Sequence, residues 1–260
     1  MISTFKVTPA MEQKYTDWID DRSRSRVVEL VMNHETRYLY QLTLADVKEV
    51  CDATEHALGL VKRKDAESVI ETRNWFPEFA FTHIMHHYLE TRHSLPTWRD
   101  LYDFLFCSEE GNSLIGIAAR RHKAERVAGG VSEKLAGDAL RWRFGNAYYS
   151  FLREVYTLVY LRGNGLDVRF HPLADALFRV DSWMDDAVIS IWVANENFRR
   201  EKGFDPQGRK DRVEDLLAGA VPSFQFVDIE LDKAEKWGCV HLPSDSALEK
   251  AKARLVAARE

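Results

Sequence analysis

Three histidines and one glutamate form the clearest set of potential metal ligands in the sequence. In the segment THIMHHYLE, His83 and His87 are four residues apart, and so are His86 and Glu90. Two histidines at this spacing share one face of a helix and can bind a metal together. The segment lacks the glutamate that follows the first histidine in HExxH metalloproteases, and aromatic residues are interleaved with the histidines. We therefore expect histidines packed at helix interfaces, with no bound metal.

Arginine and lysine occur in four short groups, which are the candidates for binding phosphate. These are Arg22, Arg24 and Arg26; Arg120, Arg121, Lys123 and Arg126; Arg141 and Arg143; and Arg199, Arg200 and Lys202. Acidic residues break up each group, which is typical of a solvated helix face. The net charge of −5 argues against a protein that coats DNA over its whole surface. A local basic face can still bind phosphate on an acidic protein.

Several other kinds of chemistry lack their motifs. The sequence has no GxxxxGK[ST], no GxGxxG after a strand and no GxSxG, so nucleotide hydrolysis, dinucleotide binding and hydrolase chemistry are not indicated. Cys51, Cys107 and Cys239 are too far apart in the sequence to indicate a disulfide framework or a thiolate zinc site. No long apolar run and no secretory signal pattern occur, which predicts a cytoplasmic protein without a membrane partner.

The first half of the chain carries a helical pattern. Over residues 8–127 the apolar residues recur every three or four positions, which predicts five or six helices. Helix starts are indicated by Thr8 before Pro9, by Thr43 with Asp46 and by Thr97 with Asp100. Stops are indicated at Gly59, near Asn74, at residues 94–96 and at Gly111. Gly129 and Gly130 then mark the best boundary, which predicts domains over residues 1–130 and 131–260.

The second half changes from a helical to an alternating period. A long helix is predicted over residues 134–162, closed by Gly163 and Gly165. Strands are predicted at residues 166–170, 176–183, 187–194 and 224–231, with helices at 208–217 and from Ser246 to the end. Ser246 and Glu249 have the spacing of a capping box. The predicted fold is α+β: an all-helical half, then a small α/β domain with a four-stranded mixed sheet flanked by helices.

This order of elements resembles the core of the PD-(D/E)XK nuclease superfamily, particularly its very-short-patch-repair and TnsA-like members. The resemblance covers roughly Arg141 to Leu231 and lies in the topology more than in the motif. It implies that a helix glutamate, an aspartate on the second strand and an acid-x-lysine on the third strand bind one or two divalent metals. Glu154 matches the helix position, and Asp175 or Asp181 matches the second.

The third position of the motif departs from the family. Across a hairpin, the face of Asp181 is expected to meet Ser190 and Trp192, which supply neither the acid nor the lysine. Glu196 could supply the acid if the register slips, and Lys210 or Arg209 from the next helix could supply the cation. Aspartates are also common in turns without any catalysis, and Glu154 could simply pair with a neighbouring arginine.

These patterns lead to one functional prediction and two alternatives. We expect a nuclease-fold subunit, catalytically inactive, that docks nucleic acid or protein within a larger assembly of a mobile element or phage defence. The resemblance places the long helix beside a DNA cleft, so the nucleic-acid contacts are expected at Arg141, Arg143, Arg153, Arg199 and Arg200. No cofactor is expected. The alternatives are an active Mg²⁺-dependent DNA endonuclease with a rearranged site and a protein-binding scaffold.

Overall fold

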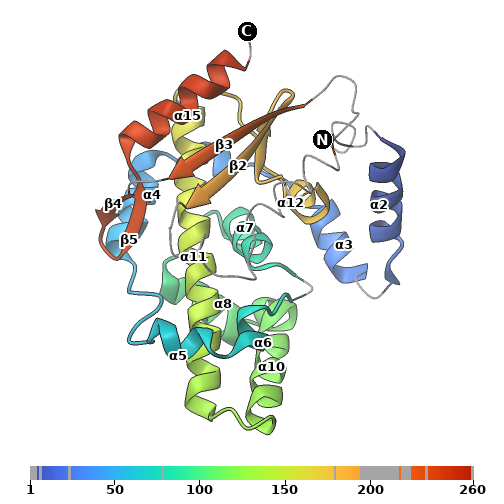
Figure 1. Cartoon of the computed structure of the whole chain (residues 1–260), viewed down its shortest axis with the longest axis vertical. Helices are drawn as coiled ribbons and strands as arrows, with labels where there is room; N and C mark the ends of the chain where they lie inside the picture. The colour runs from blue at the N-terminus through green and yellow to red at the C-terminus, as the bar shows by residue number, and fades with distance from the viewer. Residues whose placement is uncertain are drawn as a thin grey trace. The chain divides into compact units, whose positions relative to one another are not determined.

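The chain forms two compact units in its computed structural model (Figure 1). The structure describes residues 5, 8–22, 25–77, 79–178, 180–193, 217, 224–231 and 234–258. Unit 1 comprises Met1–Thr36, Tyr156–Glu235 and Pro243–Glu260, and unit 2 comprises Arg37–Val155 and Lys236–Leu242. The long helix α11 (Glu133–Gly163) contributes its first part to unit 2 and its last turns to unit 1.

The helical character predicted for the first half is confirmed. Unit 1 begins with α2 (Pro9–Ile19) and α3 (Ser25–Met32). Unit 2 contains η2 (Leu39–Gln41), α4 (Leu44–Ala53), α5 (Arg63–Glu67), α6 (Ile70–Arg73), α7 (Phe81–Arg92), α8 (Trp98–Cys107), α9 (Glu109–Gly111), the π-helix η3 (Asn112–Gly116) and α10 (Ile117–Ala128). The three predicted starts are N-caps: Thr8 caps α2, while Thr43 and Thr97 form capping boxes at α4 and α8.

The predicted helix stop at Gly111 is wrong, because the chain continues through α9, η3 and α10 without leaving helical geometry. A Cβ atom at Gly111 would lie 2.2 Å from the carbonyl oxygen of Phe104, and one at Gly116 would lie 2.4 Å from that of Leu105. The glycines therefore allow this helix to contact the backbone of α8 directly. Gly111 is a packing residue here and not a breaker.

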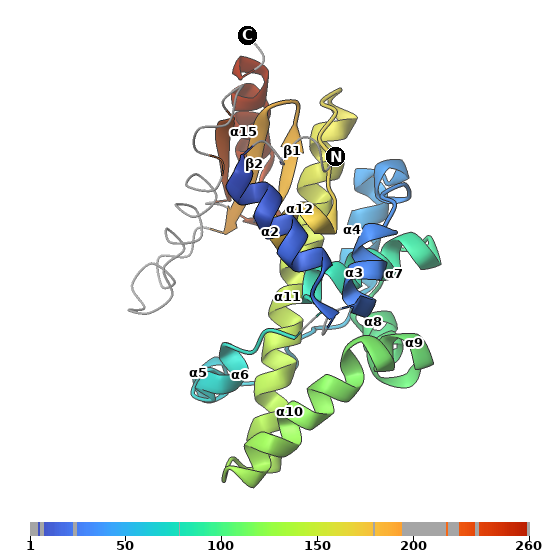
Figure 2. The same cartoon turned by 90° about the vertical axis from the view of Figure 1, so that its right-hand side faces the viewer.

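The long helix predicted over residues 134–162 is confirmed as α11. Its apolar stripe is buried as expected, including Phe144, Tyr148, Phe151 and Val155 in unit 2. Figures 1 and 2 show α10 running beside the first part of α11, and the two helices are joined by the turn at Gly129 and Gly130. Gly130 has a φ of +94°, a conformation that glycine adopts without strain.

Unit 1 contains a mixed three-stranded sheet formed by β1 (Ser182–Met184), β2 (Ala187–Val193) and β3 (Gln225–Leu231). The predicted hairpin at residues 184–186 is present, because β1 pairs antiparallel with β2 and Met184 faces Ala187. β2 pairs in parallel with β3, with Ser190 opposite Asp228. Figure 1 shows α15 (Asp245–Ala257) alongside β3.

The predicted four-stranded sheet is not found among the described residues. Residues 166–170 form no strand: only Arg169 pairs with Trp183, as an isolated bridge. The first part of the predicted strand at 176–183 is instead the end of helix α12 (Pro172–Phe178), and only its last two residues belong to β1. Its start is fixed because His171 Nδ1 accepts the backbone N–H of Leu173 at 3.1 Å, and Pro172 has a backbone angle suited to a first helical position.

A second, separate sheet was not predicted. It is the hairpin of β4 (Ala234–Trp237) and β5 (Val240–Pro243), which turns at Gly238 with a φ of +51°. A Cβ atom at Gly238 would lie 2.3 Å from the carbonyl oxygen of Cys51, so the turn sits directly against the end of α4. The ammonium group of Lys48 lies 4.2 Å from the centre of the Trp237 ring, a cation–π contact that adds to this packing.

The last helix begins with a different cap from the predicted one. Ser244, and not Ser246, is the N-cap of α15, because its extended backbone lets its hydroxyl accept the N–H of Ala247. Glu249 is not part of a capping box; its carboxylate accepts hydrogen bonds from Tyr160 and Lys252. The helix predicted over residues 208–217 lies outside the described residues except for Leu217, which is buried.

A buried group of polar atoms connects three segments of unit 2. The hydroxyl of Tyr148 on α11 donates to the carbonyl oxygen of Pro96 at 2.9 Å and contacts Thr54 Oγ1 at 3.1 Å. The same Thr54 oxygen accepts the backbone N–H of Trp98 at 2.8 Å. Burial raises the pKa of the Tyr148 phenol well above its ordinary value, so the hydroxyl remains a donor. Together these bonds attach the end of α4 and the start of α8 to α11.

We predict that Tyr148→Phe lowers the free energy of unfolding by about 1–3 kcal/mol, because the Pro96 carbonyl is left buried without its donor. Urea denaturation measures this change. Tyr102→Phe is the matched control, since the Tyr102 ring is exposed and its hydroxyl has no hydrogen bond within the described part of the chain. Equal unfolding free energies for the two variants would show that the Tyr148 hydroxyl does not hold these segments together.

Candidate functional site

Glu154, the predicted helix glutamate, lies in unit 2 beside a buried histidine. Its Oε1 is 3.5 Å from Nε2 of His86, which is itself fully buried, and the Glu154 side chain is only 14% exposed. The His86 ring also packs edge-on against Phe151, with 5.0 Å between the ring centres. Glu154 and His86 therefore form a contact between α11 and α7.

The two candidate aspartates belong to unit 1. Asp175 lies in the first turn of α12. Asp181 immediately precedes β1, and its Oδ2 accepts the backbone N–H of Ile191 at 3.0 Å. Extending the hairpin register by one residue places Asp181 opposite Ser190, whose partner on β3 is Asp228. Asp228 was missed in the sequence, because no local pattern reveals which strands pair in parallel.

The other predicted catalytic and basic positions lie outside the described residues. These are Glu196, Lys210, Arg199 and Arg200, and the side chain of Trp192 on β2 is also not described. Among the residues that are described, no group of three or more histidine, cysteine, aspartate or glutamate side chains is arranged to hold a metal ion.

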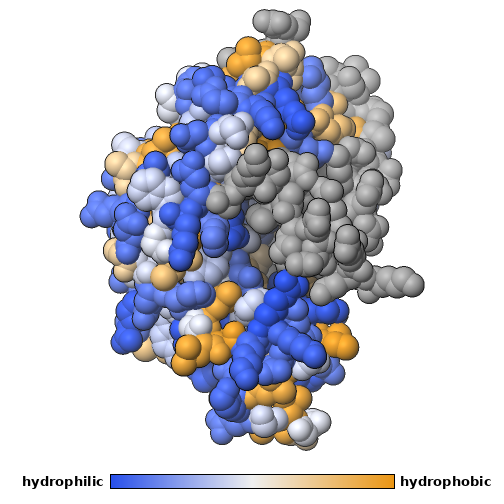
Figure 3. Space-filling model, turned by 60° about the vertical axis from the view of Figure 1, so that its left-hand side comes forward, coloured by the Kyte–Doolittle hydropathy of each residue, from blue (hydrophilic) through white to orange (hydrophobic). Residues whose placement is uncertain are grey.

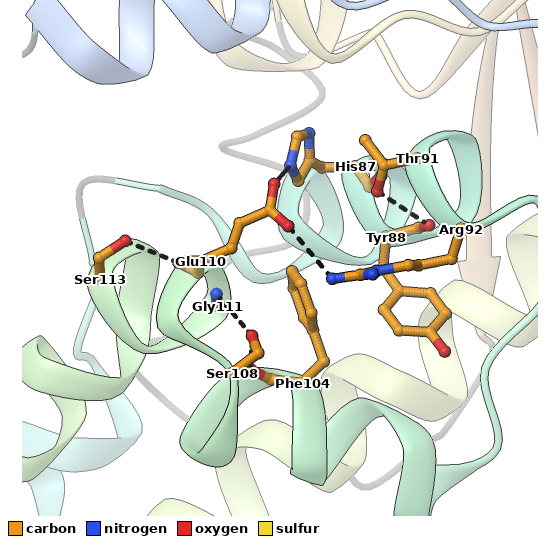
Figure 4. A network of polar contacts seen from close by, with 9 residues as sticks. All are labelled: His87, Tyr88, Thr91, Arg92, Phe104, Ser108, Glu110, Gly111 and Ser113. Carbon is orange, nitrogen blue, oxygen red and sulfur yellow. Dashed lines mark hydrogen bonds and ion pairs between the residues drawn. The ribbon is translucent and has the colours of Figure 1, made fainter.

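The carboxylates near the histidines of α7 bind other groups of the protein. Figure 4 shows Glu110 between His87 and Arg92, at 2.8 Å and 3.4 Å. Glu90, four residues after His86, instead accepts the backbone N–H groups of residues 37, 38 and 39 at 2.7–3.0 Å, near the start of η2. Glu90 and Glu110 therefore hold α7 to the segments packed around it.

Two of the predicted phosphate-binding arginines are half-buried and contact other parts of unit 2. Arg143 lies over the rings of Phe76 and Phe81, at 5.1 Å and 5.2 Å. Arg153 donates to the carbonyl oxygen of His241 at 2.8 Å. Burial lowers the pKa of both guanidinium groups, since water no longer stabilises their charge fully.

Arg141 is exposed and lines a pocket between α8, α10 and α11. The pocket has a volume of about 420 Å³, within the range of roughly 300–1,000 Å³ that is common for ligand sites. Its apolar wall consists of Trp98, Tyr102, Phe106, Leu140 and Phe144. Three cationic side chains line it as well, namely Arg120 and Lys123 from α10 and Arg141 from α11.

Residue spacing explains how the helices build this pocket. Trp98, Tyr102 and Phe106 occur at every fourth position of α8 and therefore share one face. The rings of Tyr102 and Phe106 have their centres 4.9 Å apart, and Phe106 is 5.8 Å from Phe144 on α11. The spacing of these aromatic residues can be read from the sequence. The sequence does not show that they share a pocket with the cations of α10.

The cations of the pocket are held by neutral or exposed partners. Arg141 donates through Nε to the carbonyl oxygen of Ala57 at 2.8 Å and through Nη2 to that of His56 at 3.3 Å. Arg120 donates to the side-chain oxygen of Asn112. Among the described residues, Lys123 is the one cation of the pocket with an acidic partner, Glu133 at 3.1 Å, whose side chain is highly exposed. The lining therefore keeps a positive charge that only one surface carboxylate offsets.

The surface also carries apolar side chains away from the pocket lining. Figure 3 shows hydrophobic patches between hydrophilic side chains on one face of the molecule. In unit 2, Leu60 is fully exposed, Phe76 is 73% exposed and Ile70 is 56% exposed. None of the described helices is long and apolar enough to cross a membrane.

Comparison with known proteins gives no family for this chain. No protein-family model, no curated protein and no solved structure matches it.

Proposed function

We propose that the chain is a nucleic-acid docking subunit and that the pocket of unit 2 is its contact site. One observation carries this proposal: aromatic rings and three cations line the same pocket. Aromatic rings stack with bases, and arginine and lysine bind the phosphates of the backbone. A pocket with both groups suits a ligand that is flat and apolar at one end and anionic at the other.

The charge distribution supports a local contact and not a general one. Arg120, Arg121, Lys123 and Arg126 all lie on α10, although the whole chain has a net charge of −5. Arg126 is paired with Glu71 at 3.5 Å and Lys123 with Glu133 at 3.1 Å, and both carboxylates are exposed, so a phosphate can compete with them for these cations. Such a concentrated basic surface binds phosphate while the remaining acidic surface limits non-specific coating.

The proposal keeps Arg141 as a contact and does not depend on Arg143 or Arg153. Arg143 and Arg153 are half-buried and do not line the pocket. The guanidinium group of Arg141 also donates to two backbone carbonyls, but this side chain is exposed and lines the pocket, where a phosphate can reach it. Arg120 and Lys123, which line the pocket beside Arg141, take their place as proposed contacts.

We predict that Arg120→Gln with Lys123→Gln weakens binding of a fluorescent 20-nucleotide single strand. Each phosphate contact to a single strand contributes about 0.7 to the slope of log K against log salt concentration. The double variant should therefore show a slope about 1.4 smaller in magnitude than the parent. Fluorescence anisotropy between 50 and 200 mM NaCl measures both the affinity and the slope.

A second double variant controls for the loss of two positive charges. Lys62→Gln with Lys64→Gln makes the same change of charge in unit 2, at exposed residues that do not line the pocket. It should retain both the affinity and most of the salt slope. Equal losses in the two double variants would mean that net charge, and not the pocket, determines binding.

The proposed docking role does not include cleavage by this chain. In support, Asp181 already accepts a backbone N–H of β2, and Glu154 contacts the buried His86. Both carboxylates thus have a structural use that explains their presence. The alternative is an active Mg²⁺-dependent DNA endonuclease with a rearranged site.

We predict no cleavage of DNA or RNA by the purified chain with Mg²⁺ or Mn²⁺, as measured by gel electrophoresis of labelled substrates. The matched variants are Asp175→Asn and Asp181→Asn, which keep the size of each side chain and remove its charge. Cleavage by the parent chain that disappears in either variant would overturn the docking proposal in favour of the endonuclease. Cleavage that persists in both variants would indicate a contaminating nuclease.

A protein-binding surface is a second candidate function, favoured by the exposed Leu60, Ile70 and Phe76. Exposed apolar side chains that form one patch are typical of protein interfaces, and these three lie within residues 60–76 of the sequence. These three residues do not line the pocket. Protein binding there and nucleic-acid binding at the pocket are therefore separable properties of unit 2.

A further inference from the structure

We infer that the pocket of unit 2 receives one unpaired base of a single-stranded nucleic acid, stacked against Tyr102 and Phe106, with the backbone of the strand along α10. This inference rests on the proposed function and adds the class of nucleic acid. The chain would then bind single strands, and duplexes should be poor ligands.

The aromatic lining is suited to a base that has left its stack. Tyr102 is 47% exposed, whereas Trp98 is buried, so the Tyr102 ring is the aromatic group that a ligand meets first. Phe106 lies next to it, with the planes of the two rings 47° apart. A base inside a duplex is covered on both faces by its neighbours, so only an unpaired base can offer a face to these rings.

The cations indicate a strand and not a free nucleotide. Arg120 and Lys123 are three residues apart, which corresponds to about 4.5 Å along α10. Arg141 reaches the same pocket from α11, a different helix. Phosphates on the two sides of one nucleotide occur in a strand, whereas a mononucleotide carries its phosphate at one position. The spread of cations over two helices therefore matches a continuous backbone.

Glu133 places an opposing charge at this binding surface. Its carboxylate contacts Lys123 at 3.1 Å and is 80% exposed. A phosphate approaching Lys123 has to displace this carboxylate and is repelled by it. Removing the charge should therefore tighten binding of the strand, and the direction of this effect separates a phosphate contact from a purely structural ion pair.

The experiment compares three ligands on the full chain. A 12-nucleotide single strand and a blunt duplex of the same sequence are labelled, and AMP is added as a competitor. We expect the single strand to bind at least about 10-fold more tightly than the duplex. Tyr102→Ala should weaken single-strand binding about 5- to 100-fold, the range of one lost base stack, while Tyr102→Phe should restore it. Glu133→Gln should tighten it, and circular dichroism checks that each variant is folded.

Other outcomes would contradict either the single-strand inference or the proposed function. If the duplex binds as tightly as the single strand and Tyr102→Ala has no effect, the single-strand inference fails. The docking proposal still stands in that case if Arg120→Gln with Lys123→Gln weakens binding. If AMP competes with the affinity of the strand, the pocket is a mononucleotide site and the inference fails. If neither oligonucleotide binds, the proposed function itself fails.

Discussion

The packing of unit 2 depends on the buried hydroxyl of Tyr148. It bonds to the Pro96 carbonyl and contacts Thr54, whose oxygen also accepts the backbone N–H of Trp98. Without this group, the start of α8 would lose its polar attachment to α11. The aromatic residues of α8 that form the pocket wall would then no longer be held in position at that end of the helix. The pocket is thus shaped by a few buried hydrogen bonds that the surrounding apolar core strengthens by excluding water.

Close backbone contacts supply the second constraint. Gly111 and Gly116 bring the helix of α9, η3 and α10 against α8, and Gly145 leaves room on α11 for Leu58. The π-helical turn lies where this packed helix leads into α10, the helix that carries Arg120 and Lys123. Such turns are often found next to functional sites.

Much of the secondary structure followed from local rules, and the errors have physical causes. The capping threonines and the buried stripe of α11 depend on residues three or four apart, so they were predictable. Residues 172–178 were predicted as strand or loop, but Pro172 and the side chain of His171 start a helix there. The β4–β5 hairpin was missed because its turn is stabilised by packing on α4, which lies far away in the sequence.

The sequence alone determined the helical first half, the long helix, the hairpin at residues 184–186 and the cationic groups of α10 and α11, since each arises from neighbours along the chain. Only the tertiary structure decided which of these residues meet. It half-buried Arg143 and Arg153 against other parts of unit 2, placed Asp228 beside Ser190, and joined Arg120, Lys123 and Arg141 to the rings of α8. The physical reason is that strand pairing and helix packing select partners by the shape of distant surfaces, which periodicity along one segment does not record.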